Sequence, residues 1–240
     1  MQESLNAARA ELELRRTADG SATLYVPALD EHYHSRHGAR QESEHVFIQA
    51  GLLPRLAAGL GQPGTPPLRL LEVGLGTGLN ALLTLGRTRQ TGTAVVYDGY
   101  ETRPLPAQVV AALAPEWAAQ PGAPHGEFEA LHAAPWGQPY PLAPGFFLTK
   151  RLQPVQDATL PTGYYDLVYY DAFAPEKQPE LWTEALFQQL YEAAAPGALL
   201  VSYCAQGQFR RNLRAAGWLT EKLPGPPGKR EMTRAVKAMG

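Results

Sequence analysis

The residues best placed to do chemistry lie at the ends of short apolar runs. Glu72 immediately precedes a turn in which Gly74, Gly76 and Gly78 occupy alternate positions. Glycines at alternate positions let the backbone turn sharply after a strand and approach a ligand closely. The helix expected after this turn presents free N–H groups and a positive dipole end. The segment therefore predicts a ligand-binding turn, with a purely structural connection between strand and helix as the alternative.

The kind of ligand follows from the spacing of the turn. A phosphate loop needs Gly-Lys-Ser/Thr, which is absent, and a dinucleotide fingerprint has its third glycine where this chain has Asn80. Glu72 would repel a pyrophosphate, but it suits a cofactor that carries a sulfonium and an ammonium. The turn, with Thr77 and Asn80 at its end, is therefore predicted to bind S-adenosylmethionine.

Acids that follow the next two predicted strands extend this candidate site. Glu101 follows the second strand and could accept hydrogen bonds from both ribose hydroxyls of the cofactor. The alternation of a strand points Asp98 elsewhere, and a solvated strand-end acid is the alternative for Glu101. Asp157, just after the third strand, is placed to accept a hydrogen bond from an adenine amino group, although Gln156 beside it could do the same.

Asp171 lies at the carboxyl edge of the fourth predicted strand, where the methyl group of the cofactor should be. A carboxylate there can accept a hydrogen from an amine and aim its lone pair at the sulfonium carbon. Phe173 could stack on a base, and Lys177 could lower the pKa of the amine by like charge or contact a phosphate. The alternative for Asp171 is a cap of the turn before Pro175.

The elements that must position these residues alternate between strand and helix. Apolar runs predict strands over 68–73, 94–100, 146–155, 165–170 and 198–204. Helices are predicted over 79–85, 106–119, 184–195 and 208–216. This alternation is typical of a doubly wound α/β fold, in which a mostly parallel sheet is covered on both faces and binds ligands at the carboxyl ends of its strands.

The remaining segments complete one compact unit. Residues 1–61 are predicted to form an N-terminal extension, with short strands over 11–26, a polar segment and a helix over 46–60. Residues 62–240 form the domain with the candidate site. Its tail, 219–237, predicts two more strands, and 122–144, rich in proline and glycine, reads as an insertion or long loop.

The polar segment from Tyr33 to His45 could cover the cofactor as a lid hinged at Gly38. Glu42 and Ser43 would then reach the methionine end of the cofactor, and the alternative is that Ser43 caps the following helix. His34, His37 and His45 invite a zinc interpretation, but their spacing and the lack of cysteine partners argue against it, so no metal is expected.

Net charge limits the partners that the whole chain can hold. The formal charge is -2, so a nucleic-acid partner would need a local basic patch. Basic residues do gather in the C-terminal fifth, and a solvated helix face is the alternative for each of them. These residues are Arg210, Arg211, Arg214, Lys222, Lys229 and Arg230.

The cellular setting is expected to be the cytoplasm. Cys204 is the single cysteine, which excludes an internal disulfide and fits a reducing compartment. The N-terminus lacks an apolar signal core, and no apolar stretch approaches the roughly 20 residues that span a bilayer. We therefore expect a protein without a membrane partner.

The sequence resembles the methyltransferase domain of MnmC, which is also found as the stand-alone family MnmD. The matching stretches run in order along nearly the whole chain. They are His32-Tyr33-His34-Ser35 with Gly38-Ala39, Glu42 to Phe47, Glu72 to Asn80, Asp171 to Pro179 with Trp182, Arg210-Arg211 with Ala216-Gly217, and Gly228 to Met232. The stretch from Asp171 to Trp182 is far more specific than the glycine turn. Departures from the family pattern are Gln178, where asparagine is common, and Pro226-Pro227, where an aromatic-glycine pair is usual.

The resemblance implies a class I, Rossmann-like methyltransferase with S-adenosylmethionine as methyl donor. The implied reaction methylates the aminomethyl group of the wobble uridine of tRNA, giving methylaminomethyl(-2-thio)uridine. In bifunctional relatives a flavin-dependent oxidase domain follows. This chain stops at Gly240, so a stand-alone enzyme is expected, with a separate enzyme supplying the aminomethyl group.

The resemblance also assigns residues. Carried over by motif, the cofactor would be held by Glu72, Gly74, Gly76, Gly78, Glu101 and Asp157, and Asp171 would face the amine. The candidate tRNA contacts are Tyr33, Arg210, Arg211, Lys229 and Arg230. The alternatives are a methyltransferase for a small-molecule amine, a binding module without turnover and an aminopropyltransferase.

Overall fold

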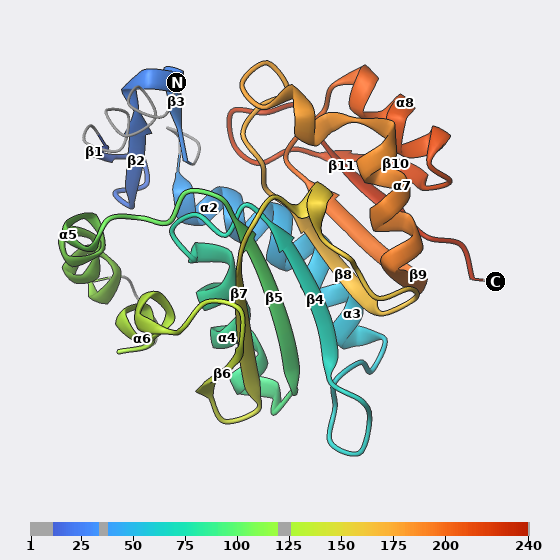
Figure 1. Cartoon of the computed structure of the whole chain (residues 1–240), viewed down its shortest axis with the longest axis horizontal. Coiled ribbons are helices and arrows are strands. Elements are labelled where there is room, and N and C mark those ends of the chain that lie inside the picture. The colour runs from blue at the N-terminus through green and yellow to red at the C-terminus, as the bar shows by residue number, and fades with distance from the viewer. Residues whose placement is uncertain (1–11, 34–37, 120–125, 240) are drawn as a thin grey trace.

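The computed structural model describes residues 12–33, 38–119 and 126–239. An eight-stranded sheet, in the order β10-β11-β9-β8-β4-β5-β7-β6, forms its centre (Figure 1). The strands are β4 (Leu68–Val73), β5 (Val95–Glu101), β6 (Pro139–Ala143), β7 (Phe146–Leu152), β8 (Tyr165–Tyr170), β9 (Ala194–Ser202), β10 (Leu219–Pro224) and β11 (Glu231–Val236). The five strands from β9 to β7 pair in parallel, and the flanking strands β11, β10 and β6 pair antiparallel. The predicted mostly parallel sheet is confirmed.

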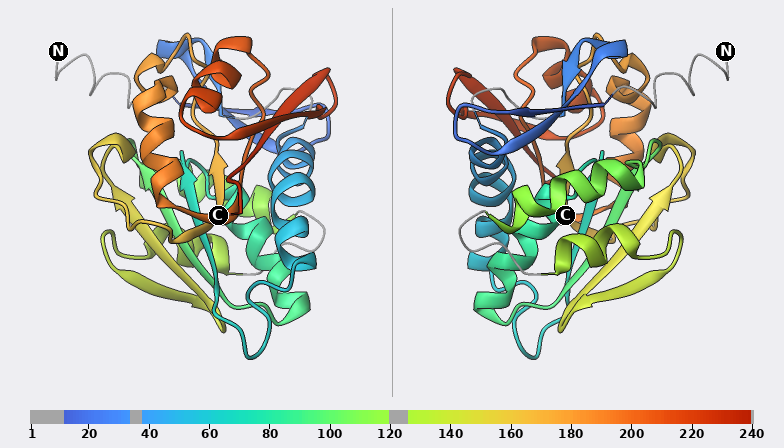
Figure 2. Two further views of the ribbon diagram at one scale, coloured as in Figure 1. Left: turned by 90° about the vertical axis from the view of Figure 1, so that its right-hand side faces the viewer. Right: turned by 90° about the vertical axis from the view of Figure 1, so that its left-hand side faces the viewer.

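Helices cover both faces of this sheet (Figure 2). They are α2 (Ala39–Ser43), the π-helix η3 (Glu44–Leu52), α3 (Leu53–Ala57), α4 (Leu79–Thr91), α5 (Ala107–Ala118), α6 (Glu127–Ala133), α7 (Glu184–Ala193) and α8 (Gly207–Ala215). Leu68 and Leu70 of β4 pack in one core with η3, α4, α5 and α6, whereas Leu71 and Val73 pack in a second core with α7 and α8. Successive side chains of a strand point to opposite faces, so the apolar run of β4 produces this doubly wound architecture.

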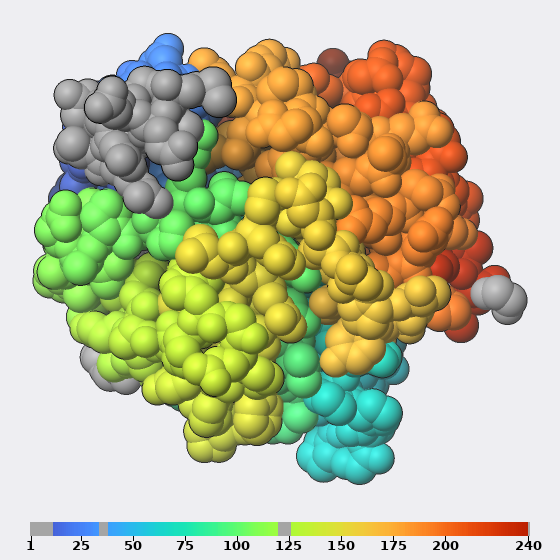
Figure 3. Space-filling model, viewed as in Figure 1, coloured from blue at the N-terminus to red at the C-terminus, as the bar shows by residue number. Residues whose placement is uncertain are grey.

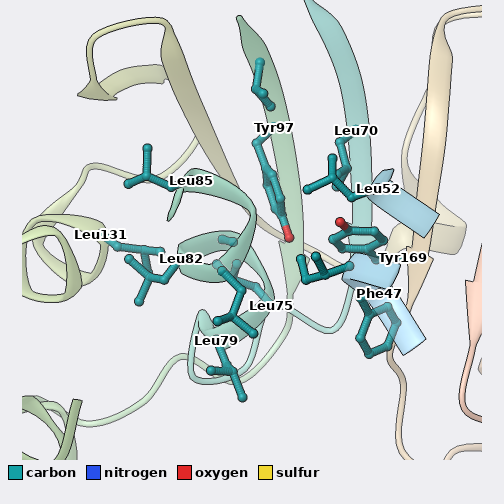
Figure 4. Packing of buried hydrophobic residues seen from close by; sticks show 14 of the residues in the cluster. Phe47, Leu52, Leu70, Leu75, Leu79, Leu82, Leu85, Tyr97, Leu131 and Tyr169 are labelled. Atoms are coloured by element: carbon teal, nitrogen blue, oxygen red, sulfur yellow. The ribbon is translucent and has the colours of Figure 1, made fainter. Parts of the chain in front are cut away.

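Aromatic rings fill the first core beneath the site (Figure 4). Tyr97 and Tyr169 are fully buried, and Phe47 of η3 packs against Tyr169 with ring centroids 5.2 Å apart. A side chain at Gly51 would lie 2.9 Å from Val201, so the missing Cβ allows η3 to approach the sheet closely. Residues of the predicted N-terminal extension therefore belong to the main core.

The segment before the glycine turn differs in detail from the expectation. The helix begins at Ala39, seven residues before the predicted start at Val46, so part of the predicted polar lid is helical. Ala39, Glu42 and Ser43 are buried in this helix, and Arg40 and Gln41 between them are more exposed. Ser43 lies inside the helix and makes no side-chain capping bond, so its N-cap alternative is wrong. His34 and His37 lie outside the described residues.

A three-stranded antiparallel sheet precedes this helix. It consists of β1 (Glu13–Arg16), β2 (Ala22–Val26) and β3 (Glu31–His32), with the short 3-10 helix η2 (Pro27–Leu29) before β3. The Asp19 carboxylate accepts hydrogen bonds from Thr17, from the Ser21 amide and from the Gln41 amide. One turn side chain thereby joins the hairpin to α2.

The expected insertion is partly regular. In its described part, 126–144, α6 buries Phe128 and Leu131, and β6 pairs with β7 as the edge strand of the sheet. Neither element was predicted from the sequence, because α6 is short and β6 begins with a proline, a residue that is typical of loops and strand edges. Two 3-10 helices, η4 (Val155–Asp157) and η5 (Pro179–Trp182), follow β7 and β8. Throughout residues 12–33, 38–119 and 126–239, each helix is too short or too polar to cross a membrane.

Candidate active site

A cavity of about 380 Å³ lies at the carboxyl ends of the parallel strands. It is lined by the segments that follow β4, β5, β7 and β8, and by residues 30–33, Glu42, Tyr203 and Lys229. In the space-filling view, the segment after β5 (green) and the segment after β7 (yellow) meet at the surface (Figure 3). The cavity lies where an open parallel sheet binds its ligands.

The glycine turn forms one wall of the cavity. Gly74 has φ +87°, and a Cβ there would lie 2.5 Å from the backbone oxygen of Asp171. Gly76 has φ +53°, and a Cβ there would lie 3.2 Å from the Tyr33 ring. Both positions therefore require glycine. Gly78 lies outside the lining, and a Cβ there would meet Leu131, so this glycine serves helix packing.

Glu101 faces the cavity from the end of β5. Its carboxylate accepts hydrogen bonds from the amides of Gly76 at 2.9 Å, Thr102 at 2.8 Å and Arg103 at 2.7 Å. Burial raises the pKa of Glu101, and these amides oppose that shift. A carboxylate offers about four acceptor positions, so Glu101 keeps capacity for a ribose hydroxyl. Asp98 points away from the cavity, toward Tyr165 and Arg151.

Three polar side chains connect the floor of the cavity to Asp171. Asn80 donates one amide hydrogen to Glu72 at 2.9 Å and one to Asp171 at 2.8 Å. Glu72 is completely buried, and its other carboxylate oxygen accepts a hydrogen bond from Tyr97 at 2.7 Å. Burial raises the pKa of Glu72 well above its usual value. The Oδ1 atom of Asn80 is buried without a hydrogen-bond partner, and such an acceptor favours a ligand that brings a donor.

The charges of the lining fit a cationic cofactor. Among the described lining residues, Lys229 is the single lysine or arginine. The lining carboxylates are Asp30, Glu31, Glu42, Glu101, Asp171 and Glu180. Buried carboxylates need opposite charge or hydrogen-bond donors. A sulfonium, an ammonium and ribose hydroxyls would supply both, so the residues present fit S-adenosylmethionine.

Asp171 is the titratable group beside which an amine would lie. Its pKa is raised to about 7, because burial and the Glu42 charge raise it more than the Asn80 hydrogen bond and the Lys229 charge lower it. A carboxyl group with this pKa exchanges a proton near neutral pH. Asp171 can therefore act as a hydrogen-bond acceptor and a proton acceptor.

The loop after Asp171 is held by side-chain contacts. The Phe173 amide donates to Gln178 at 3.0 Å, and Trp182 Nε1 donates to the Phe173 carbonyl at 2.9 Å. The Phe173 ring meets Tyr33 edge-on with ring centroids 5.2 Å apart. The contacts within the stretch from Asp171 to Trp182 thus hold Phe173 against Tyr33 at the cavity. Sequence reasoning missed Tyr203, which donates to the Ala172 carbonyl at 2.8 Å, because only tertiary packing brings it there.

Five predicted cofactor-binding or catalytic residues lie outside the cavity lining, namely Glu72 and Gly78, described above, and Asp157, Lys177 and Ser43. Asp157 is exposed, and Gln156 lines the cavity in its place, so the predicted adenine contact is better supported for Gln156. Lys177 is absent from the lining, which leaves a phosphate contact as its remaining predicted role. Ser43 is buried in the core side of α2, while Glu42 beside it reaches the cavity.

The predicted tRNA contact of Arg210 is wrong. Arg210 is 5% exposed, and its guanidinium pairs with Glu231 at 3.0 Å and donates to Thr233 at 3.0 Å. Arg211 beside it is exposed and hydrogen-bonds only to Gln208 of the same helix among the described contacts. Arg210 therefore ties α8 to β11.

Substitution of Arg210 by alanine should destabilise the fold. Loss of the guanidinium leaves Thr233 and Glu231 without this partner, so we expect the Tm to fall by roughly 5 °C or more. Arg211→Ala, the matched control, should change Tm by no more than about 1 °C. Thermal unfolding followed by circular dichroism measures both, and equal Tm values for the two variants would contradict the structural role of Arg210.

Comparison with known proteins agrees with this geometry. Residues 151–238 match the model of a family described as S-adenosyl-L-methionine-dependent methyltransferase. The crystal structure of MNMC2 from Aquifex aeolicus, 24% identical in sequence, has a TM-score of 0.74 and covers 96% of this chain and 72% of that chain. Residues 151–238 thus match an S-adenosyl-L-methionine-dependent methyltransferase family, and the fold and the cavity agree with that class.

Within this class, the chain is related to the MnmC proteins. It is 34% identical over 236 residues to the tRNA 5-methylaminomethyl-2-thiouridine biosynthesis bifunctional protein MnmC of Magnetococcus marinus, covering 89% of this chain and 32% of that protein. The MnmC of Chromohalobacter salexigens is 30% identical over 235 residues, covering 92% and 32%. The chain thus spans about a third of the length of these relatives. The predicted resemblance to MnmC is confirmed. Within the described residues, no group of three or more potential ligands could hold a metal ion.

Proposed function

We propose that this enzyme methylates the primary amine of 5-aminomethyl(-2-thio)uridine at the wobble position of tRNA. The product is 5-methylaminomethyl(-2-thio)uridine. The names of the MnmC relatives, which describe biosynthesis of this nucleoside in tRNA, support the substrate. The observation that carries the chemistry is Asp171, a half-buried carboxylate oriented by Asn80 at the end of β8.

The chain contributes orientation and proton acceptance. When bound, S-adenosylmethionine supplies the methyl group on a positively charged sulfur. Asp171 accepts a hydrogen bond from the substrate N–H, so the nitrogen lone pair can be directed away from the carboxylate. After the nitrogen has gained a methyl group, it is a positively charged secondary ammonium. Asp171, whose pKa is about 7, is placed to accept one proton from it.

Aromatic side chains at the cavity suit a planar base. Tyr33 and Phe173 contact each other edge-on at the lining, and ring faces of this kind stack on bases. Arg211 and Arg230 are exposed and keep the predicted phosphate-contacting role, together with Lys177. Because the reaction starts from an amine, a separate activity has to generate the aminomethyl group.

Nucleoside mass spectrometry tests the substrate. The enzyme is incubated with S-adenosylmethionine and tRNA carrying 5-aminomethyl-2-thiouridine, and the tRNA is then digested to nucleosides. We expect the aminomethyl nucleoside to be replaced by one heavier by a single methyl group. Free 5-aminomethyluridine and spermidine serve as controls. Faster methylation of either free amine than of tRNA would contradict the proposal and favour a small-molecule methyltransferase.

A further inference from the structure

Glu42 and Lys229 form an ion pair in the wall of the cavity. Lys229 Nζ donates to Glu42 Oε1 at 2.6 Å. Glu42 belongs to α2, and Lys229 belongs to the connection between β10 and β11, 187 positions further along the chain. The Glu42 side chain is 10% exposed and that of Lys229 34% exposed. Both charges are thus largely withdrawn from water and face the cavity.

Tyr203 fixes Lys229 relative to Asp171. The Lys229 ammonium lies 4.1 Å from the centre of the Tyr203 ring, a cation–π distance. The hydroxyl of the same tyrosine donates to the carbonyl of Ala172, the residue after Asp171. The charges of Glu42 and Lys229 both act on Asp171. The ion pair is therefore held beside Asp171, whereas Glu101 marks the end of the cavity at β5.

A ligand that joins this ion pair must carry both signs of charge. A lone cation would meet Lys229, and a lone anion would meet Glu42. An ammonium has three N–H donors and a carboxylate about four acceptor positions, so each partner can keep its bond and make another. Asn80, which donates a hydrogen bond to Asp171 at 2.8 Å, lines the same cavity and holds that carboxylate beside the ion pair.

We propose that Glu42 and Lys229 bind the α-amino-acid end of S-adenosylmethionine. Lys229 binds its carboxylate, and Glu42 binds its ammonium. The four charges then alternate in sign. This assigns Lys229 to the cofactor in place of the tRNA contact predicted from sequence, and it does not depend on the identity of the methylated amine.

Two ligands that differ only at this end test the assignment. S-adenosylhomocysteine carries the amino-acid group, and 5′-methylthioadenosine keeps the adenosine and sulfur but lacks that group. Calorimetry measures the Kd of each for the wild type and for Glu42→Gln/Lys229→Gln. The double variant removes both charges, so no buried charge is left unpaired. We expect S-adenosylhomocysteine to bind at least ~10-fold more weakly, with the Kd of methylthioadenosine changed by less than about 2-fold.

Lys222→Gln is the matched control, because Lys222 is an exposed lysine of the same hairpin outside the cavity. It should leave both Kd values unchanged. An equal loss for the two ligands in the double variant, or unchanged binding of S-adenosylhomocysteine, overturns the assignment. If the double variant does not fold, Glu42→Gln alone decides by the same comparison of ligands. Neither readout uses tRNA, so failure here is distinct from failure of the proposed function.

Discussion

Asp171→Ala is expected to lower kcat for tRNA methylation by at least ~100-fold while the Kd of S-adenosylhomocysteine changes by less than about 3-fold. The cofactor contacts of Glu101 and the glycine turn stay in place in this variant, but the amine loses the group that orients it and takes its proton. Rates measured with labelled methyl donor and calorimetry on the same preparation give the two quantities.

The pH dependence of the wild type should show the same group. Burial raises the pKa of Asp171 to about 7, so protonation removes the acceptor below that pH. We expect kcat/KM for S-adenosylmethionine, which reports the free enzyme, to fall about tenfold for each pH unit below 7. In Asp171→Asn this acid limb should disappear from the residual activity.

Glu176→Gln is the control for both measurements. Glu176 is an exposed carboxylate of the same loop, it lies outside the cavity, and it accepts a hydrogen bond from Gln206. Its substitution should leave kcat and the acid limb unchanged. Wild-type turnover in Asp171→Ala would remove Asp171 from the reaction, and an acid limb that persists in Asp171→Asn would assign it to another group.

The second large effect is expected at the opposite end of the cavity. Glu101→Ala should weaken S-adenosylhomocysteine and 5′-methylthioadenosine alike, by at least ~30-fold, because both ligands carry the ribose that hydrogen-bonds to a charged acceptor. The variant also frees the Gly76 amide, which donates to Glu101 at 2.9 Å. Calorimetry with the two ligands measures the loss.

Asp98→Asn provides the comparison within the same strand. The Asp98 carboxylate contacts Arg151 and the Tyr165 hydroxyl on the other face of the sheet. Its substitution can lower the stability of the fold, but it should leave both Kd values within about 2-fold of the wild type. If Asp98→Asn weakens binding as much as Glu101→Ala does, the ribose contact is wrongly assigned.

The part of the site that lies on strand ends could be predicted from the sequence. Glu101 and Asp171 each follow or end an apolar run, and parallel strands bring their carboxyl ends to one edge. Glu72 lies one residue before the end of β4 and is buried beneath the cavity, where it accepts a hydrogen bond from Asn80. Asp157 shows the limit of this reasoning. The chain leaves β7 through a 3-10 helix that puts Gln156 into the lining and its neighbour outside, and a difference of one residue in a turn is beyond a strand-end argument.

Contacts between distant segments could not be predicted in this way. Nothing in the spacing of Glu42, Tyr203 and Lys229 indicates that they meet, because the sheet order places β11 beside β9 and brings the hairpin over α2. Arg210 and Arg211 look equivalent in a basic run. Arg210, next to the buried Phe209, lies on the face of α8 that packs toward β11. Arg211 lies on the side of the helix that faces solvent.

The ion pair between α2 and the β10–β11 connection also bears on how the chain acquires its activity. Contacts between residues this far apart in sequence form late, because closing the long loop between them costs conformational entropy before the contacts can stabilise the fold. During synthesis, a growing chain that has not yet reached Lys229 lacks one wall of the pocket. We therefore expect ribosome-bound or truncated chains that end before β10 to bind the methyl donor more weakly than the full chain, so that tight binding accompanies completion of the fold.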